Sequence, residues 1–228
     1  MSPPAPSPPT CSLCGSSDVT PFHRDARREY ARCRQCRLVF VPPQFWLDAA
    51  AEKACYDLHQ NSPDDPRYRQ FLGRLFVPMV EKLEPRSRGL DFGSGPGPTL
   101  SVMFAEAGFP TAIYDSFYAA DRSVWDRRYD FVVASEVVEH LHRPLTELQR
   151  LWDVLRPAGW LGIMTKRVLD EAAFARWHYK ADPTHVCFFA SETFAWLASR
   201  WGAEWQAIGA DVVLLRKPPV GPAQFREA

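Results

Sequence analysis

Two pairs of cysteines have the spacing of a metal site. Cys11 and Cys14 form one C-x2-C pair, and Cys33 and Cys36 form the second after 18 intervening residues. Two thiolates two residues apart can chelate one ion, and a second pair completes a tetrahedral site for Zn²⁺ with Zn–S distances of about 2.3 Å. Four protein ligands leave no open coordination position, so we predict a structural zinc site that this short unit needs to fold. A redox role for one pair is the alternative.

Six arginines crowd these cysteines: Arg24, Arg27, Arg28, Arg32, Arg34 and Arg37. They form either a nucleic-acid surface or a counter-charge for the metal cluster combined with a docking face against the rest of the chain. Residues 11–40 carry a formal charge of +3, which falls to about +1 once four thiolates bind one Zn²⁺. We therefore favour the counter-charge interpretation.

The segment LDFGSGPGP, residues 90–98, joins an apolar strand to a helix through Gly93, Gly95 and Gly97. Glycine permits positive φ and lets the backbone approach a ligand, and a helix N-terminus offers unpaired N–H groups. A dinucleotide site would need G-x-G-x-x-G, whose third glycine falls here on Pro98. With Asp91 ahead of the turn, the pattern favours a ligand that has an amino-acid moiety and a single ribose. A plain tight turn is the alternative.

Further polar residues follow the predicted strands. Asp115 ends the second strand, 20 residues after Gly95, where a carboxylate can accept hydrogen bonds from ribose hydroxyls or simply cap the strand. His140 follows the apolar strand YDFVVAS, and His185 lies in the long connection 166–190. Because ligands bind beyond the carboxyl ends of such strands, we predict His185 as a general base and His140 as the second choice. Packing roles for both are the alternatives.

The connection 166–190 adds Trp177, His178, Tyr179 and Lys180 near the same place. Asp182 precedes His185 by three residues, a spacing that lets its carboxylate orient the imidazole. Glu136 and Glu139 lie on one short turn after YDFVVAS. Glu136 is expected to line the site, and solvation of both carboxylates is the alternative.

The elements that must position these residues alternate between strand and helix from residue 85 onward. The predicted strands and helices are strands 88–93, 110–115, 129–135 and 160–165, helices 98–108, 143–159 and 191–202, and a terminal antiparallel pair 204–209 and 210–217. Ser191 is the expected cap of the last helix. Such alternation predicts an α/β fold with a mostly parallel sheet and helices on both faces.

Residues 66–217 resemble the class I S-adenosylmethionine-dependent methyltransferases. The resemblance is carried by LDFGSGPG, by Asp115, by YDFVVASEVVEHL, by LRPAGWLGIMT and by the terminal pair. It is closest to a bacterial branch with an N-terminal zinc ribbon and a W-H-Y-x-x-D-P-T-H-V segment, here residues 177–186. The resemblance implies a Rossmann-like methyltransferase sheet with a C-terminal antiparallel strand. Only 13 residues separate Asp115 from Tyr129, so we expect the third strand to be missing together with its adenine-contacting acid, which Asp121 could replace.

The resemblance also implies how the S-adenosylmethionine (SAM) cofactor is held. Gly93, Gly95 and Gly97, with Ser94 between them, would wrap its methionine end. Asp91 would orient this loop or meet the amino group, Asp115 would hold the ribose, and Ser135 with Glu136 would line the floor where methyl donor and acceptor meet. His185, His140 and Glu136 are then the candidate catalytic residues.

The domain organisation follows from these segments. We expect a disordered Pro-rich tail at 1–10, a zinc ribbon at 11–43, a helical linker or cap at 44–84, a SAM-binding methyltransferase domain at 85–217, and a tail at 218–228. Tyr56 and Tyr68 in the linker would close over the cofactor as a lid or pack against the main domain.

Composition limits the partners. The 27 Lys and Arg balance 27 Asp and Glu, which argues against a general polyanion binder. No apolar run approaches the roughly 18 residues of a spanning helix, and MSPPAPSPPT has no signal-peptide features, so we expect a cytoplasmic protein without a membrane partner. The favoured function is SAM-dependent methyl transfer to a small molecule of the sugar or secondary-metabolite type. An RNA methyltransferase that docks through the ribbon, or a non-catalytic adaptor, is the alternative.

Overall fold

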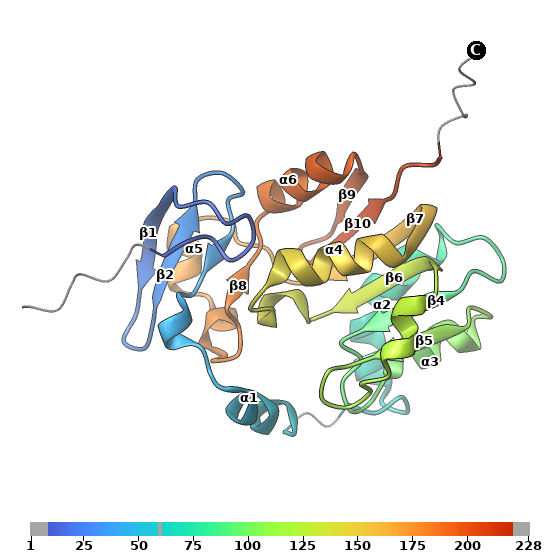
Figure 1. Ribbon diagram of the computed structural model, residues 1–228. Coiled ribbons are helices and arrows are strands. Elements are labelled where there is room, and N and C mark those ends of the chain that lie inside the picture. The colour runs from blue at the N-terminus through green and yellow to red at the C-terminus, as the bar shows by residue number, and fades with distance from the viewer. Residues whose placement is uncertain (1–8, 59–60, 221–228) are drawn as a thin grey trace, which may run out of the picture.

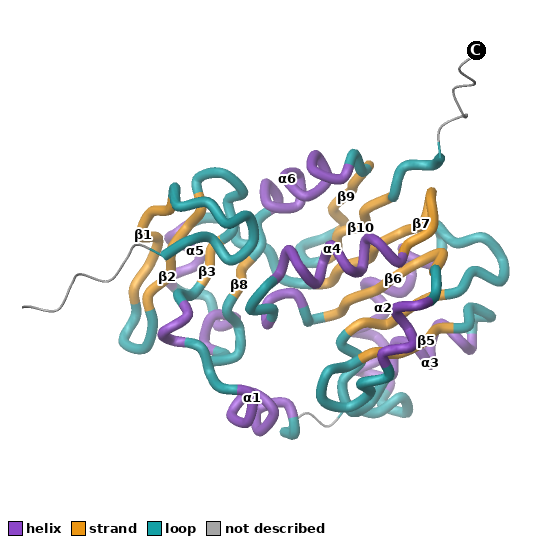
Figure 2. Tube along the Cα trace, in the orientation of Figure 1, coloured by secondary structure: helices purple, strands orange, loops and turns teal. Residues whose placement is uncertain are grey.

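The computed structural model describes residues 9–58 and 61–220 of the chain (Figure 1). Of the two predicted tails, residues 1–8 and 221–228 lie outside the described residues. A six-stranded sheet and a four-stranded sheet organise the rest, and the smaller sheet contains the N-terminal strands (Figure 2).

The larger sheet has the strand order β5-β4-β6-β7-β10-β9. Its strands are β4 (Gly89–Phe92), β5 (Thr111–Tyr114), β6 (Tyr129–Ser135), β7 (Leu155–Met164), β9 (Glu204–Ile208) and β10 (Val212–Arg216). β5, β4, β6 and β7 are parallel, and β10 runs antiparallel to β7 and β9. The predicted mostly parallel sheet and its terminal antiparallel pair are therefore confirmed. Between β5 and β6 lies only the 3-10 helix η2 (Arg122–Asp126), so the third strand is missing as expected.

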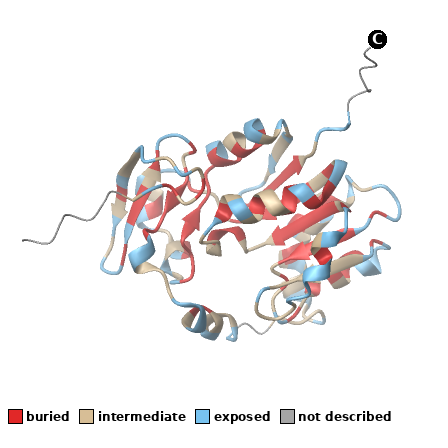
Figure 3. Ribbon diagram, in the orientation of Figure 1, coloured by how far each residue is buried: buried red, intermediate tan, exposed pale blue. Residues whose placement is uncertain are grey.

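Helices cover both faces of this sheet because its central strands are apolar on both sides (Figure 3). Along β6, Val132 and Ala134 enter one core, and Phe131 and Val133 enter the other. The helices α4 and α6 pack into the first core and α2 and α3 into the second. Their bounds are α2 (Pro66–Val80), α3 (Thr99–Glu106), α4 (Pro144–Val154) and α6 (Ser191–Trp201). Within the described residues no helix has the length and apolar character that a membrane span requires.

The smaller sheet joins the N-terminal unit to a distant segment. Its strands are β1 (Val19–Arg24), β2 (Glu29–Cys33), β3 (Val39–Phe40) and β8 (Cys187–Phe188). β2 and β3 form an antiparallel hairpin, and the second cysteine pair lies at its turn, with Cys33 at the end of β2 and Cys36 in the turn itself. β8 comes from the connection between β7 and α6, and it pairs antiparallel with β3. The N-terminal unit and this connection therefore share one sheet.

Short helices complete the chain. They are η1 (Pro43–Phe45), α1 (Ala49–Tyr56), η3 (Val138–His140), α5 (Glu171–Ala175) and η4 (His178–Ala181). α1 and α2 begin where Asp48 and Asp65 accept hydrogen bonds from backbone N–H groups of the first turn. The connection 166–190 thus contains more regular structure than its sequence pattern indicates.

Two predicted boundaries are wrong. The helix expected at 143–159 ends at Val154, and strand β7 already begins at the next residue. At this end of the helix, Nζ of Lys217 donates to the carbonyl oxygens of Trp152 (2.6 Å) and Leu155 (2.9 Å). Pro157, which cannot continue a helix, follows at once. The residue that precedes α6 is Ala190 and not Ser191, and its N–H donates to Thr193 Oγ1 at 3.2 Å.

Candidate functional site

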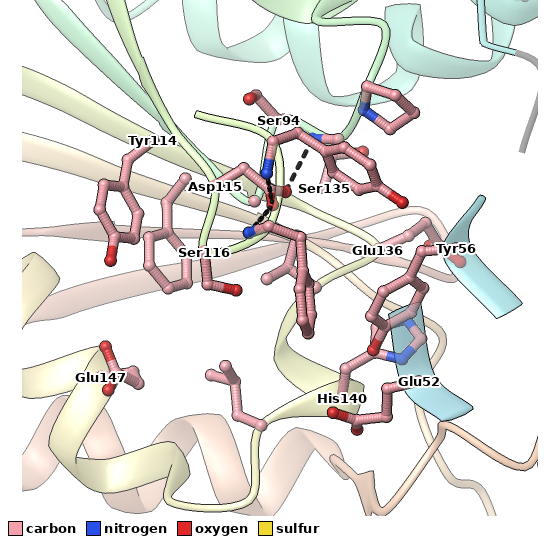
Figure 4. Close-up of a pocket in the computed structure, with 18 of the residues that line it drawn as sticks. Glu52, Tyr56, Ser94, Tyr114, Asp115, Ser116, Ser135, Glu136, His140 and Glu147 are labelled. Atoms are coloured by element: carbon pink, nitrogen blue, oxygen red, sulfur yellow. Dashed lines mark hydrogen bonds between the residues drawn. The ribbon is translucent and has the colours of Figure 1, made fainter. Parts of the chain in front are cut away.

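A cavity of about 630 Å³ opens at the carboxyl ends of β4 and β6. The chain leaves β4 toward β5 on one side and later returns to β6 on the other, and open α/β sheets bind ligands at such a switch point. Figure 4 shows Ser94, Asp115 and Ser135 on the sheet side of this cavity and Glu52 and Tyr56 of α1 across from them. The structure thus gathers the predicted ligand-binding segments around one space.

The three glycines of the turn have three different surroundings. Gly93 has φ 72°, and a Cβ atom there would lie 2.4 Å from the Val137 side chain. Gly95 has φ 64° and lines the cavity with no atom within 4 Å of a Cβ position. Gly97 does not line the cavity. It packs against the backbone of Asn61, whose oxygen would lie 2.1 Å from a Cβ atom placed on Gly97. Gly95 is therefore the position at which the backbone can approach a ligand most closely.

Asp115 connects the glycine turn to the end of β5. Its Oδ2 accepts a hydrogen bond from the Gly95 N–H at 2.9 Å, and its Oδ1 accepts from the N–H groups of Phe117 (2.8 Å) and Tyr118 (3.1 Å) (Figure 4). Because a carboxylate has about four acceptor positions, Asp115 can hold these loops and still accept from a ligand in the cavity.

The other two acids considered for the cofactor lie away from the cavity. Asp91 is buried and does not line it, and its carboxylate accepts a hydrogen bond from the Ser101 backbone. Burial raises the pKa of Asp91 to about 7. This geometry suits the predicted loop-orienting role better than contact with an amino group. Asp121 caps η2 through the Ser123 N–H and does not line the cavity, so it does not replace the missing adenine-contacting acid.

Three buried polar atoms of the cavity wall have no hydrogen-bond partner among the described residues. They are Oγ of Ser94, Oγ of Ser135 and Oε1 of Glu136. An unpaired buried polar atom costs about 1–3 kcal/mol, so this wall is arranged for a polar ligand. Together with the open backbone at Gly95, these atoms fit a ligand that carries an amino-acid group and ribose hydroxyls.

An aromatic wall, which the sequence reasoning missed, lies at the β5 end of the cavity. Tyr114 packs parallel to Phe92 and edge-on to Trp125, with ring centroids 5.9 Å and 4.8 Å apart. The Arg150 guanidinium lies 3.6 Å above the Trp125 ring, and both Tyr114 and Arg150 line the cavity. Nothing in the spacing of Arg150 within α4 distinguishes it from a solvent-facing arginine.

The linker contributes Tyr56 and Tyr68, both of which line the cavity. Burial raises the pKa of Tyr56, and its ring meets the His140 ring edge-on with centroids 5.3 Å apart. The two tyrosines predicted as a lid or as packing residues therefore border the binding space.

Two carboxylates follow β6 on the far side of the cavity. Glu136, with a positive φ of 52°, and Glu139 both accept hydrogen bonds from the Tyr179 hydroxyl, the former at 3.2 Å. Burial raises the pKa of both carboxyls, and the nearby charge of Glu136 raises the pKa of Glu139 further. Glu139 is 0% exposed, so the alternative that it is solvated is wrong.

The two favoured histidines lie against each other beside these carboxylates. Their ring centroids are 4.6 Å apart, and both line the cavity. Nδ1 of His185 lies 2.7 Å from the Tyr179 backbone oxygen, and burial lowers the pKa of His185. A neutral ring therefore donates from Nδ1 and carries its lone pair on Nε2. Asp182 lies near Nε2, at 3.8 Å, which is beyond hydrogen-bond distance.

His178 is separate from this group. Its Nε2 lies 3.0 Å from Nζ of Lys166, and it does not line the cavity. The structure thus brings His140 and His185 together and leaves the third histidine of the region outside.

Arg28 of the N-terminal unit holds the segment that carries His185. Its guanidinium is buried and donates to the backbone oxygens of Lys180, Asp182, Pro183 and His185, the last at 3.0 Å. Of the two interpretations of the arginines, this contact supports the docking face. A guanidinium committed to four carbonyls cannot also contact phosphates.

The four predicted cysteine ligands converge as well. The sulfur atoms of Cys11, Cys14, Cys33 and Cys36 all lie within 4.8 Å of one another. The sulfurs of Cys11 and Cys36 are 3.4 Å apart, and those of Cys14 and Cys33 are 3.5 Å apart. Tetrahedral Zn–S bonds of about 2.3 Å would place the sulfurs about 3.8 Å apart, so the cluster fits this ion. All four are free thiols.

Comparisons with known proteins agree with this geometry. The profile of a family described as "Methyltransferase domain" matches residues 64–207. The structure of 1,6-didemethyltoxoflavin-N1-methyltransferase from Burkholderia thailandensis, with bound 1,6-didemethyltoxoflavin and S-adenosylhomocysteine, is similar with a TM-score of 0.52 at 18% identity. The match covers 87% of this chain and 99% of that chain. No curated protein matches the sequence.

A second similar structure is a SAM-dependent methyltransferase from Archaeoglobus fulgidus. Its TM-score is 0.52 at 14% identity, and the match covers 73% of this chain and 99% of that chain. At such identities the likeness concerns the fold. It confirms the predicted Rossmann-like methyltransferase sheet.

Proposed function

Since the chain belongs to the methyltransferase domain family, we propose that it transfers the methyl group of SAM to a small organic acceptor. The observation that carries this proposal is the cavity at the switch point. There the backbone of Gly95 is open to a ligand, and buried oxygen atoms of Ser94, Ser135 and Glu136 have no hydrogen-bond partner among the described residues. When bound, SAM supplies a methyl group that is electrophilic because it is attached to a sulfonium.

The residues of the cavity divide into a donor side and an acceptor side. Asp115 would accept hydrogen bonds from the ribose, and Ser94 and Ser135 would pair their free hydroxyls with the donor. Displacement at carbon requires aligned reactants and exclusion of water, which the aromatic wall and α1 provide around this space. In the metal-free chain, Nε2 of neutral His185 can accept the proton that an acceptor group loses.

The acceptor is proposed to be a small molecule, with the sugar and secondary-metabolite types as the favoured classes. Support comes from the volume of the cavity, about 630 Å³, which suits a small molecule, and from the contacts that Arg28 makes inside the molecule. An RNA acceptor has no corresponding support, because the formal charge of the chain is zero and Arg28 is buried.

Cofactor binding tests the proposal directly, by titration of S-adenosylhomocysteine (SAH). We expect Gly95→Ala to weaken SAH binding at least about tenfold, because a methyl group there enters the cavity and strains a positive φ. The matched control is Gly209→Ala in the β9–β10 turn, which has the same kind of positive φ (55°) but lies away from the cavity. Wild-type protein that binds no SAH, or equal effects of the two substitutions, would refute the proposal.

The acceptor class is tested with SAM that carries a labelled methyl group and a cell extract as the source of acceptors. Label in a product of metabolite size supports the proposed small-molecule acceptor. Label that disappears from a large product after ribonuclease treatment would instead show that RNA is methylated.

A further inference from the structure

Beside the donor site lies a second group of residues that can bind a metal ion. One candidate ligand atom from each of Glu139, His140 and His185 lies within 4.8 Å of the other two. Glu139 and His140 come from η3, and His185 comes from the connection that leads to β8. We propose that these three residues bind a divalent transition-metal ion on the acceptor side of the cavity.

The two imidazoles are oriented as metal-binding histidines usually are. Nδ1 of His185 lies 2.7 Å from the Tyr179 backbone oxygen, and Nδ1 of His140 lies 3.3 Å from that of Thr184. Metal-bound histidines nearly always donate one ring N–H to a carbonyl or carboxylate, which fixes the ring and directs the other nitrogen at the ion. Both rings here are held by backbone carbonyls in this way.

The environment of Nε2 on His185 also favours a cation. With the proton on Nδ1, this nitrogen carries a lone pair, and the Asp182 carboxylate oxygen lies 3.8 Å from it. Two acceptors that face each other at this distance make no hydrogen bond, but both would be stabilised by a positive ion nearby.

The carboxylate of the group is independent evidence for a ligand. Glu139 is 0% exposed, its Oε1 accepts from the Tyr179 hydroxyl, and its Oε2 is buried without a partner among the described residues. Tyr179 has one hydroxyl proton, yet its oxygen lies beside both Glu139 and Glu136. Ionising both carboxyls beside this one hydroxyl is costly, and a divalent ion bound to Glu139 would stabilise the ionised form.

The ligand set indicates which kind of ion binds. Two imidazoles and one carboxylate suit Fe²⁺, Co²⁺ or Zn²⁺ best, whereas Mg²⁺ prefers oxygen ligands. Mn²⁺ binds more weakly in the same order of affinities and serves as the spectroscopic probe. Three protein ligands leave coordination positions open, in contrast to the closed four-cysteine cluster. If the proposed methyl transfer takes place, the open positions face the acceptor and select one with a hydroxyl that can bind the ion. Nε2 of His185 is then a metal ligand and not a general base.

The test is a titration of the full chain with Mn²⁺ after its cysteine cluster has been loaded with Zn²⁺. Free Mn²⁺ is counted by its electron paramagnetic resonance signal, and we expect one Mn²⁺ to bind per chain. Glu139→Gln and His185→Asn should each weaken this binding at least about tenfold, because each removes a ligand. Thermal unfolding shows whether both variants are folded.

Matched controls come from the same region. Glu147→Gln removes another carboxylate of the cavity, and His178→Asn removes a histidine of the same connection. Both variants should bind Mn²⁺ as tightly as the wild-type protein does. No binding at millimolar Mn²⁺, or equal losses in the control variants, would overturn the inference. SAH binding is measured on the same samples. Mn²⁺ binding without SAH binding would contradict only the proposed function. SAH binding without Mn²⁺ binding would contradict only the proposed metal site.

Discussion

Asp91 shows how strongly burial acts on a single carboxyl group beside the glycine turn. It is enclosed between β4 and α3, where the Ser101 backbone donates to it, and desolvation raises its pKa from 3.8 to about 7. Well below pH 3.8 the carboxyl is protonated in both the folded and the unfolded chain. As pH rises toward 7 the unfolded chain loses this proton first, so the free energy of unfolding falls until the folded-state pKa is passed.

We predict that Asp91→Asn removes this pH dependence. The shift of about three pKa units corresponds to roughly 4 kcal/mol, so above pH 7 the variant should be the more stable protein, and near pH 4 the two should be equal. Urea unfolding between pH 4 and pH 8 measures the effect. Parallel stability curves for the two proteins over this range would contradict it.

Asp121→Asn is the matched control. Hydrogen bonds to the Ser123 N–H and hydroxyl lower the pKa of this exposed carboxyl, so its contribution to stability is lost as pH falls. Its effect on the pH dependence should therefore have the opposite sign to that of Asp91.

At the residue scale the sequence predicted those site residues whose position follows from the end of a strand. Ser135, Glu136 and Asp115 directly follow or end strands β6 and β5, and all three line the cavity. Gly97 and Glu139 differ from expectation because their surroundings depend on distant contacts, with Asn61 and Tyr179 respectively. No local pattern contains such contacts.

At the scale of elements, the connection 166–190 depends on the N-terminal unit for its shape. β8 pairs with β3, Arg28 binds four carbonyls between residues 180 and 185, and Lys180 pairs with Asp25 at 3.3 Å. The acceptor side of the cavity is therefore held from outside the methyltransferase sheet. The glycine turn, by contrast, is held within it.

We predict that Arg28→Lys loosens the connection and leaves the donor side intact. A lysine has three donors on a single nitrogen and cannot span carbonyls that a guanidinium bridges. Amide hydrogens of residues 178–188 should exchange faster, whereas those of residues 89–97 and the SAH affinity should not change. Methyl transfer should fall about tenfold to a hundredfold, because a small displacement of acceptor-side groups is costly.

Arg34→Lys serves as the control because Arg34 is exposed and only faces Asp18 at 3.7 Å. If Arg28→Lys lowered SAH affinity as much as it lowered methyl transfer, the inference that the donor side and the acceptor side of the cavity are held independently would be wrong.

The alternation of strands and helices was enough to predict a mostly parallel larger sheet with a terminal antiparallel pair, because each strand there is an apolar run between turns. It could not predict β8, which is two residues long and exists only because β3 lies beside it. α4 ends at Val154, earlier than predicted, and the distant Lys217 binds the carbonyl oxygens at that end.

For the whole molecule, the cysteine cluster supports the cavity although it lies outside it. We predict that Cys33→Ser abolishes stoichiometric zinc, disorders the smaller sheet and removes methyl transfer while SAH binding persists. Metal analysis, hydrogen exchange and SAH titration on one sample measure all three. Cys55→Ser, outside the cluster, should retain the zinc. A zinc-free chain with full methyl transfer would contradict this dependence.

The pairing of Phe40 in β3 with Cys187 in β8 also affects how the protein is made. The ribosome releases the cysteines before β8, so the zinc ion that we predict for them can bind while most of the larger sheet is still unsynthesised. The partner strand emerges much later, and the pairing must close a loop of about 150 residues, a slow step with a high entropic cost. We therefore expect the predicted zinc site to form before β8 pairs with β3, and the proposed acceptor side of the cavity to be completed after it.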